Sequence, residues 1–301
     1  MIKRYLQFLG LDETKLLLEA NERPLIPTIR VNTLKITIED LKEKLLRKGC
    51  TLESIEGISY GFRVMKAKFN LGATHEYLQG YYYLQNLASM IPAIILDPKE
   101  VDVVIDMCAA PGSKSTQIAQ LMINEGKLIL IDRNIKRIPK LEINLRRMGI
   151  ENSIIINMDA RNLKKLNLKA NKILLDAPCT GEGLIRQDPT RKSSKTINDI
   201  EKMASIQKDL LKSGLESLKP GGQLVYSTCS IAPEENELVI DDVLKDKSEF
   251  AIVKIPTKYG ADGIIDVYNK SLREDIKYSQ RLFPHINNTI GFFVCLIQRN
   301  I

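Results

Sequence analysis

Two cysteines occupy the kind of position from which a thiol can act on a bound molecule. Cys179 belongs to the segment DAPCTG at 176–181, and Cys229 belongs to YSTCS at 226–230. Each segment ends a short apolar run that is typical of a buried strand. Both thiols are therefore predicted at the carboxyl edge of a sheet. There they could form a disulfide, belong to a metal site, pack in the core, or act together on one substrate.

The cysteine and histidine content argues against two of these interpretations. The chain has five cysteines without any CxxC pair, and only His75 and His285 could join them as imidazole ligands. Disulfide frameworks and zinc sites normally use paired or closely spaced residues, so we expect neither a disulfide nor a metal. The small and polar neighbours of Cys179 and Cys229 also argue against core packing. The cysteines expected to be ordinary buried residues are Cys50, Cys108 and Cys295.

Short apolar runs alternate with helical patterns from Val101 onward. The runs are rich in Ile, Leu and Val, as in parallel strands covered on both faces. They occupy residues 101–106, 127–132, 153–157, 172–176 and 222–227. A helix is predicted over residues 198–218, with Asn198 and Glu201 as capping residues. A last strand is predicted over 289–299, antiparallel and at or near an edge, and the whole order predicts a doubly wound α/β sheet.

Residues 1–95 show a different pattern. A helical N-terminus is followed by a strand at 27–33, a helix capped by Thr37 with Asp40, and a second strand-like run at 58–64. We interpret this part as a small, basic α+β domain. Its boundary is placed near residue 97, which leaves residues 96–301 for the larger domain.

The segment DMCAAPGSKS at 106–115 joins the first strand of the larger domain to a helix. Its small residues allow the backbone to approach a ligand closely. A phosphate-binding P-loop would need glycines where the chain has Cys108 and Ser113, and GxGxxG is absent. S-adenosylmethionine needs no phosphate cradle, but it does need an acid after the second strand for its ribose hydroxyls. Carboxylates follow the second, third and fourth strands, at Asp132, Asp159 and Asp176.

These motifs together resemble the Sun/Fmu-type RNA cytosine-5 methyltransferases. The resemblance is carried by DMCAAPGSK, DAPCTGEG and YSTCSIAPEENE, and it extends through RVNTLK, YYLQNLASMIP and RLFPHINNTIGFFVCLI. It implies a seven-stranded, Rossmann-like sheet of S-adenosylmethionine-dependent methyltransferases with a smaller N-terminal RNA-binding domain. Ser113 departs from the glycine usual in the family, and Pro139 is unusual early in a helix.

The same resemblance implies a set of site residues. Carbon 5 of cytosine is a poor nucleophile, so a thiolate adds first at carbon 6. In the family this thiolate corresponds to Cys229, Cys179 assists release of the product, and Asp176 contacts ring nitrogen 3, oriented by Lys114. His285 would lie near the active site without an assigned role. The implied S-adenosylmethionine residues are Cys108, Ala109, Ala110, Pro111, Gly112, Ser113, Lys114, Asp132, Arg137, Asp159 and Asp176.

The net charge of +7 suits an anionic partner, and the resemblance points to RNA, with tRNA favoured over rRNA. The target base must be unstacked to expose both faces of its ring. Tyr81, Tyr82 and Tyr83 are expected to pack between domains more than to stack on bases. Residues predicted to clamp phosphates are Arg30, Asn32, Arg186, Arg191, Lys192 and Lys195.

Two rival functions remain open from the sequence. An amino-group or uracil methyltransferase would share the cofactor pocket, and a non-catalytic RNA-binding relative would share the fold. With no apolar run long enough to span a bilayer and no secretory signal, we expect a cytoplasmic protein, and we favour a monomer.

Overall fold

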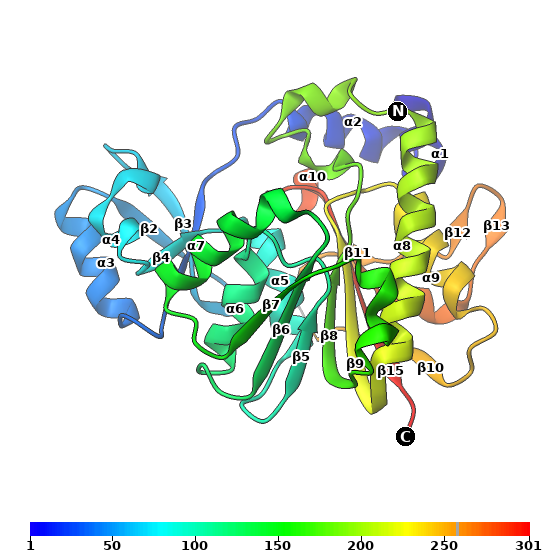
Figure 1. Cartoon of the computed structure of the whole chain (residues 1–301). Helices are drawn as coiled ribbons and strands as arrows, with labels where there is room; N and C mark the ends of the chain where they lie inside the picture. The colour runs from blue at the N-terminus through cyan, green and yellow to red at the C-terminus, as the bar shows by residue number, and fades with distance from the viewer. Residues whose placement is uncertain (257–258) are drawn as a thin grey trace.

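The computed structural model describes residues 1–256 and 259–301, which form two main sheets of unequal size (Figure 1). The smaller sheet is antiparallel and has the order β2-β3-β1-β4. Its strands are β1 (Thr28–Val31), β2 (Thr51–Ile55), β3 (Ile58–Lys66) and β4 (Tyr82–Leu84). Helix α3 (Ile38–Arg47) buries Leu41 and Leu45 in the core of this sheet. As predicted, Thr37 caps α3 by accepting a hydrogen bond from the amide of Asp40.

The first two helices lie far from this sheet. Helix α1 (Ile2–Phe8) and helix α2 (Leu11–Asn21) lie at the top of the view in Figure 1, away from α3 at its left, and α2 packs against α10 (Pro284–Asn287). Tyr5 and Leu17 share an apolar cluster with Ile231 and Phe283. The first two helices therefore pack on the larger domain, although they belong to the N-terminal part of the chain.

The larger sheet confirms the predicted methyltransferase architecture. Seven strands follow the order β7-β6-β5-β8-β9-β15-β14; the first five are parallel, and β15 runs antiparallel to β9 and β14. The short strands β10 and β11 extend the sheet by pairing with β15 and β14. The parallel strands are β5 (Val103–Asp106), β6 (Lys127–Asp132), β7 (Ser153–Asn157), β8 (Ala170–Asp176) and β9 (Leu218–Thr228). The others are β10 (Phe250–Val253), β11 (Ala261–Asp262), β14 (Gln280–Leu282) and β15 (Phe292–Arg299).

Both faces of this sheet are covered, which explains the nearly continuous apolar runs. Alternate strand residues belong to different cores: Val104 and Leu174 contact one cluster, and Ile105 and Ile173 the other. The first cluster includes residues of α5 (Leu87–Leu96), α6 (Ser113–Leu121) and α7 (Ile138–Met148). The second includes residues of α8 (Ile197–Ser217) and α9 (Glu237–Leu244). The two helical layers hold the carboxyl ends of the strands at one edge, where the loops emerge.

Helix α8 begins one residue before its predicted start and uses different capping residues. Its N-cap is Thr196, whose hydroxyl accepts from the amide of Asp199, while the Asp199 carboxylate accepts from the amide of Thr196. The predicted caps, Asn198 and Glu201, lie inside the first turns. The reciprocal Thr196–Asp199 pair satisfies two free amides at once, so it decides where the helix starts.

Short elements complete the chain. They are α4 (His75–Leu78), the hairpin β12 (Asp266–Val267) and β13 (Lys270–Ser271), and 3-10 turns at Leu71–Ala73, Ile135–Arg137, Ala160–Leu166, Glu182–Leu184, Pro189–Lys192, Pro233–Glu235 and Glu274–Tyr278. Across the described part of the chain, no helix combines the length and apolarity needed to cross a membrane.

Candidate active site

The two cysteine segments meet at the carboxyl edge of the larger sheet. Strands β8 and β9 are parallel neighbours with Asp176 opposite Ser227, so the loops that follow them leave the sheet side by side. The Sγ atoms of Cys179 and Cys229 lie 2.9 Å apart, and both cysteines are free. Both line one cavity of about 240 Å³. The structure therefore places two thiols within reach of a single bound molecule.

The environment of Cys179 favours its protonated form. The hydrogen bond with Cys229, together with burial, raises the pKa of the Cys179 thiol well above its ordinary value. Cys179 is thus a thiol at neutral pH, and its proton can be donated to the neighbouring sulfur. Of the cysteines expected to be ordinary, Cys50 and Cys295 are buried as predicted, whereas Cys108 is half-buried and lines the cavity.

The Asp176 carboxylate, which also lines the cavity, is held at both oxygens. Lys114, in the first turn of α6, donates to Oδ2 at 2.8 Å, and the Ser227 hydroxyl donates to Oδ1 at 2.8 Å. The Asp176 side chain is 31% exposed, whereas Lys114 is 11% exposed and lies 5.5 Å from the ring centroid of Phe292. These contacts fix the carboxylate while leaving it accessible from the cavity.

The loop between β5 and α6 is built around a buried acid. Asp106 accepts hydrogen bonds from the Ser115 hydroxyl at 2.7 Å and from the Cys108 amide at 3.3 Å. Burial raises its pKa to about 7. At the end of the loop, Gly112 has φ +102°, and a Cβ there would lie 2.9 Å from Cδ1 of Leu141. Glycine is therefore required at this turn for both conformation and space.

Two further acids face the same cavity from the ends of β6 and β7. Asp132 accepts from the amides of Ala110 at 3.1 Å and Asn134 at 2.9 Å, and it pairs with Arg137 at 3.3 Å. Asp159 pairs with Arg161 at 2.7 Å, and this hydrogen bond lowers the pKa of Asp159. These side chains suit S-adenosylmethionine. The carboxylates can accept hydrogen bonds from ribose hydroxyls and from a cationic group, and a glycine turn and apolar walls lie beside them.

Only part of the predicted cofactor loop lines the cavity. Cys108 and Ala110 do so, whereas Ala109, Pro111, Gly112, Ser113 and Lys114 are not among the residues that line it. Sequence reasoning missed Met107 and Leu184, which also line it. Ile206 and Leu210 of α8 line it too; an apolar helix face looks the same in the sequence whether it packs on a sheet or borders a cavity.

Arg30 and Asn32 lie elsewhere than predicted. Both are buried, at 0% and 1% exposure. Arg30 donates to Gln85 at 2.7 Å, to Thr116 at 2.7 Å and to Gln120. Asn32 donates to the carbonyl oxygens of residues 80 and 148, each at 2.8 Å. These two side chains join the small sheet to the larger domain and offer nothing to a phosphate, which corrects their assignment as RNA contacts.

The basic loop after the first cysteine motif is folded onto the protein. Arg186 donates to the carbonyl oxygens of Arg23 and Pro24, each at 2.9 Å. Lys192 pairs with Glu22 at 2.5 Å. Arg191 donates to the carbonyl oxygen of Thr180 at 2.8 Å and lines the cavity, whereas Lys195 is exposed. Tyr82 is buried in the core of the small sheet itself, Tyr83 is buried beside Arg30 and Arg147 of α7, and Tyr81 is half-buried.

His285 lies outside the cavity lining. Its Nε2 is 2.7 Å from a carboxylate oxygen of Glu13, at the contact between α10 and α2. In residues 1–256 and 259–301, no cluster of three or more His, Cys, Asp or Glu side chains could hold a metal ion.

The strand order and this pocket define an S-adenosylmethionine-dependent methyltransferase. The family model of the 16S rRNA methyltransferases RsmB/F matches residues 93–298, and the model of the N-terminal domain of the 16S rRNA methyltransferase RsmF matches residues 1–87. The chain belongs to this RsmB/F family, which bears out the resemblance to Sun/Fmu-type enzymes.

Relatives with different RNA substrates show comparable similarity. A tRNA (cytosine(49)-C(5))-methyltransferase of Pyrococcus abyssi is 36% identical over 92% of this chain and 89% of that protein. A 28S rRNA (cytosine-C(5))-methyltransferase of Mus musculus is 38% identical over 99% of this chain but 38% of that protein. The chain thus spans less than half the length of some curated relatives.

Solved structures agree with the fold. A methyltransferase homologue of Pyrococcus horikoshii superposes with a TM-score of 0.90 at 39% identity, covering 99% of this chain and 93% of that one. NSun6 of Pyrococcus horikoshii, solved with SFG, has a TM-score of 0.89 at 28% identity, and the match covers 99% of this chain and 97% of that one.

Proposed function

We propose that this protein transfers a methyl group from S-adenosylmethionine to carbon 5 of cytosine in RNA. One observation carries the proposal: two free thiols, 2.9 Å apart, share a cavity with the strand-end carboxylates. Methylation of an amino group needs no thiol, whereas methylation at carbon 5 needs a nucleophile that first adds to the ring. Family membership supports the same chemistry.

In this mechanism, the Cys229 thiolate adds to carbon 6 of cytosine, and the ring electrons move toward carbon 5. Family membership supports this assignment of roles, with Cys229 as the attacking group and Cys179 as the partner thiol hydrogen-bonded to it. After methylation, the carbon 5 proton passes to solvent, the electron pair of that C–H bond re-forms the double bond between carbons 5 and 6, the bond between Sγ and carbon 6 breaks, and the Cys229 thiolate leaves. Cys179 assists this release because its Sγ lies 2.9 Å from the departing sulfur, close enough to donate a hydrogen bond to it.

Asp176 acts at ring nitrogen 3, where negative charge develops as the thiolate adds; to stabilise that charge, a proton must be shared between a carboxyl oxygen of Asp176 and nitrogen 3. Lys114 and Ser227 hold its two oxygens, so the carboxyl group does not reorient during the reaction. A preorganised polar group of this kind stabilises charge in the transition state without a reorganisation cost.

The cofactor would be held by the residues that border the cavity on the side of β5, β6 and β7. Asp132 and Asp159 accept from the ribose hydroxyls and the methionine ammonium group, and Arg137 supports Asp132. S-adenosylmethionine supplies an electrophilic methyl group on a sulfonium. The protein's part is to orient this group toward the cytosine and to exclude water.

We infer tRNA as the RNA substrate. The Pyrococcus abyssi tRNA methyltransferase shares 89% of its own length with this chain, so its named activity belongs to the shared part. The longer rRNA methyltransferase of Mus musculus has more than half of its sequence outside the match. Arg191, Lys192 and Lys195 are the proposed phosphate contacts around the flipped base, and the small N-terminal sheet provides further RNA-binding surface. A cytoplasmic monomer remains a prediction.

Transfer of a radiolabelled methyl group to tRNA and rRNA transcripts tests this proposal. We expect 5-methylcytosine in tRNA after digestion, no turnover with Cys229→Ala, and a covalent protein–RNA complex on denaturing gels with Cys179→Ala. Methylation by Cys229→Ala, or labelled uracil or amino-methylated bases, would contradict the chemistry. Labelling of rRNA alone would show that the substrate is rRNA and not tRNA.

A further inference from the structure

The segment Pro233–Glu237, with the sequence PEENE, packs behind both cysteine loops. Glu235, Asn236 and Glu237 have no exposed surface, yet all three side chains are polar. Buried polar groups of this kind need partners, and the partners show what the segment holds in place. The mechanism above assigns no task to any of the three.

Glu235 holds the loop that carries Cys179. Its carboxylate accepts from the Thr180 amide at 2.8 Å and from the Thr180 hydroxyl at 2.6 Å. Gln207 of α8 donates both to Glu235 at 3.2 Å and to the carbonyl oxygen of Pro178 at 2.8 Å. The residues on either side of Cys179 are therefore tied to one carboxylate, directly on one side and through Gln207 on the other.

In residues 1–256 and 259–301, the Glu235 carboxylate accepts hydrogen bonds from the Thr180 amide, the Thr180 hydroxyl and the Gln207 amide group. No ion pair to Glu235 occurs within the described part of the chain, so these hydrogen bonds hold the side chain in place. A glutamine at this position would turn an NH₂ group toward one of the donors. The arrangement thus requires an acceptor-only group and gives a reason for a buried carboxylate here.

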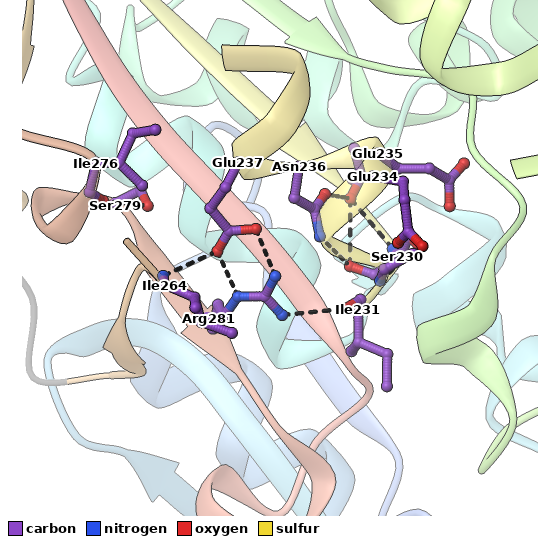
Figure 2. Close-up of polar contacts among 12 residues, drawn as sticks. Ser230, Ile231, Glu234, Glu235, Asn236, Glu237, Ile264, Ile276, Ser279 and Arg281 are labelled. Atoms are coloured by element: carbon purple, nitrogen blue, oxygen red, sulfur yellow. Dashed lines mark hydrogen bonds and ion pairs between the residues drawn. The ribbon is translucent and has the colours of Figure 1, made fainter. Parts of the chain in front are cut away.

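Asn236 holds the loop that carries Cys229. Its Nδ2 donates to the carbonyl oxygen of Ser230 at 3.0 Å, and its Oδ1 accepts from the Thr228 hydroxyl at 2.6 Å. Figure 2 shows Asn236 facing Ser230 in this way. Thr228 and Ser230 flank Cys229, so this side chain spans the nucleophile's position.

Glu237 turns away from the cysteines. It forms a buried ion pair with Arg281 of β14 and accepts from the amide of Ile264 at 3.2 Å (Figure 2). Arg281 in turn donates to the carbonyl oxygen of Ile231 at 3.0 Å. This pair anchors the segment to the sheet, and it contacts the loop of Cys229 through the carbonyl oxygen of Ile231, two residues past the nucleophile.

We propose that Glu235 and Asn236 are positioning residues that set the two thiols relative to each other. Glu235 positions Cys179 for release of the product, and Asn236 positions Cys229 for attack on carbon 6. Because the two residues are adjacent in the chain and buried, neither loop can shift relative to the other without breaking one of these hydrogen bonds. This inference rests on the proposed function, since it concerns two steps of that reaction.

Substitution of Thr180 tests the release step with a matched pair of variants. Thr180→Val keeps the shape but removes the hydroxyl donor to Glu235, whereas Thr180→Ser keeps the donor. We expect Thr180→Val to increase the protein fraction trapped on tRNA in denaturing gels by about fivefold or more and to lower kcat, with KM for tRNA unchanged. Thr180→Ser should restore release to within about twofold of the parent protein. Glu235→Gln should act in the same direction as Thr180→Val.

Substitution of Asn236 tests the attack step. Asn236→Asp keeps the acceptor for Thr228 but removes the donor to Ser230. In a Cys179→Ala background, where the adduct accumulates, we expect it to slow adduct formation by about tenfold. Glu237→Gln is the control: it disturbs a buried ion pair in the same segment, so it should lower the melting temperature but leave attack and release within about twofold.

The outcomes separate this inference from the proposed function. If Cys179→Ala alone traps no RNA, the proposed function is wrong. If Cys179→Ala traps RNA but Thr180→Val releases it normally, Glu235 does not position Cys179. Equal trapping by Glu237→Gln and Glu235→Gln would show a general loss of stability instead of positioning. Should Glu235→Gln fail to fold, the Thr180 pair decides.

Discussion

Replacing Arg30 by leucine distinguishes a structural role of this side chain from contact with RNA. Arg30 lies on β1 of the small sheet, is fully buried, and donates to Gln85, Thr116 and Gln120. Thr116 and Gln120 belong to α6, so these hydrogen bonds join the two domains. Leucine would leave all three acceptors without this donor. We therefore expect a loss of stability without a direct loss of RNA binding.

The size of the effect follows from two opposing terms. Three hydrogen bonds from a charged donor contribute about 2 kcal/mol each, or roughly 6 kcal/mol. Burial lowers the pKa of Arg30 from its usual 12.5 to about 10, which corresponds to roughly 3 kcal/mol of desolvation that the variant no longer bears. The free energy of unfolding should therefore fall by about 3 kcal/mol.

Urea unfolding and RNA binding as a function of salt concentration provide the measurement. Binding is compared at a temperature where both proteins are folded. Each lost phosphate contact reduces the slope of log affinity against log salt by about 1. We expect an unchanged slope for Arg30→Leu and a slope reduced by about 1 for the control Arg191→Leu. A reduced slope with unchanged stability for Arg30→Leu would refute the structural role.

Three further predictions concern the pocket. Gly112→Ala should weaken S-adenosylmethionine binding about tenfold in calorimetry, because φ +102° and the close approach of Leu141 strain a Cβ; unchanged affinity would contradict this geometry. For Asp106, the pKa is raised to about 7, so the folded protein binds this proton more tightly than the unfolded chain, and stability falls as pH rises from about 4 toward 7. In urea unfolding, the free energy of unfolding of Asp106→Asn should therefore rise by roughly 2–3 kcal/mol relative to that of the parent protein between pH 5 and pH 8. A difference that does not change with pH would show that Asp106 is ionised throughout this range. Lys114→Met should lower kcat for methyl transfer at least about tenfold with little change in cofactor affinity, because it frees the Asp176 carboxylate; an unchanged kcat would mean that Ser227 alone orients it.

Much of the larger domain follows from local sequence patterns. Continuous apolar runs predict strands buried on both faces, and the structure contains each of them within a few residues. The end of such a run also predicts where a side chain leaves the sheet, so the positions of Asp132, Asp176, Cys179 and Cys229 could be expected. Helix starts were less certain: Thr37 was identified, whereas Thr196 was missed because several capping residues compete within a few positions.

Roles that depend on the surroundings of a side chain could not be predicted in this way. Arg30 and Asn32 were assigned to phosphates because of their residue types, but packing of the small sheet against α6 and α7 buries them. The first two helices were assigned to the nearer domain, yet Tyr5 packs against Phe283 at the far end of the chain. Local patterns carry no information on which distant surface a segment will cover.

The sequence alone therefore determined the class of fold, the family and the two cysteine motifs, because these depend on residue order and on periodicity. Only the tertiary structure decided that the two thiols lie 2.9 Å apart and that Glu235 and Asn236 stand behind them. The physical reason is that this distance depends on the pairing of β8 with β9 and on buried hydrogen bonds between residues far apart in the chain.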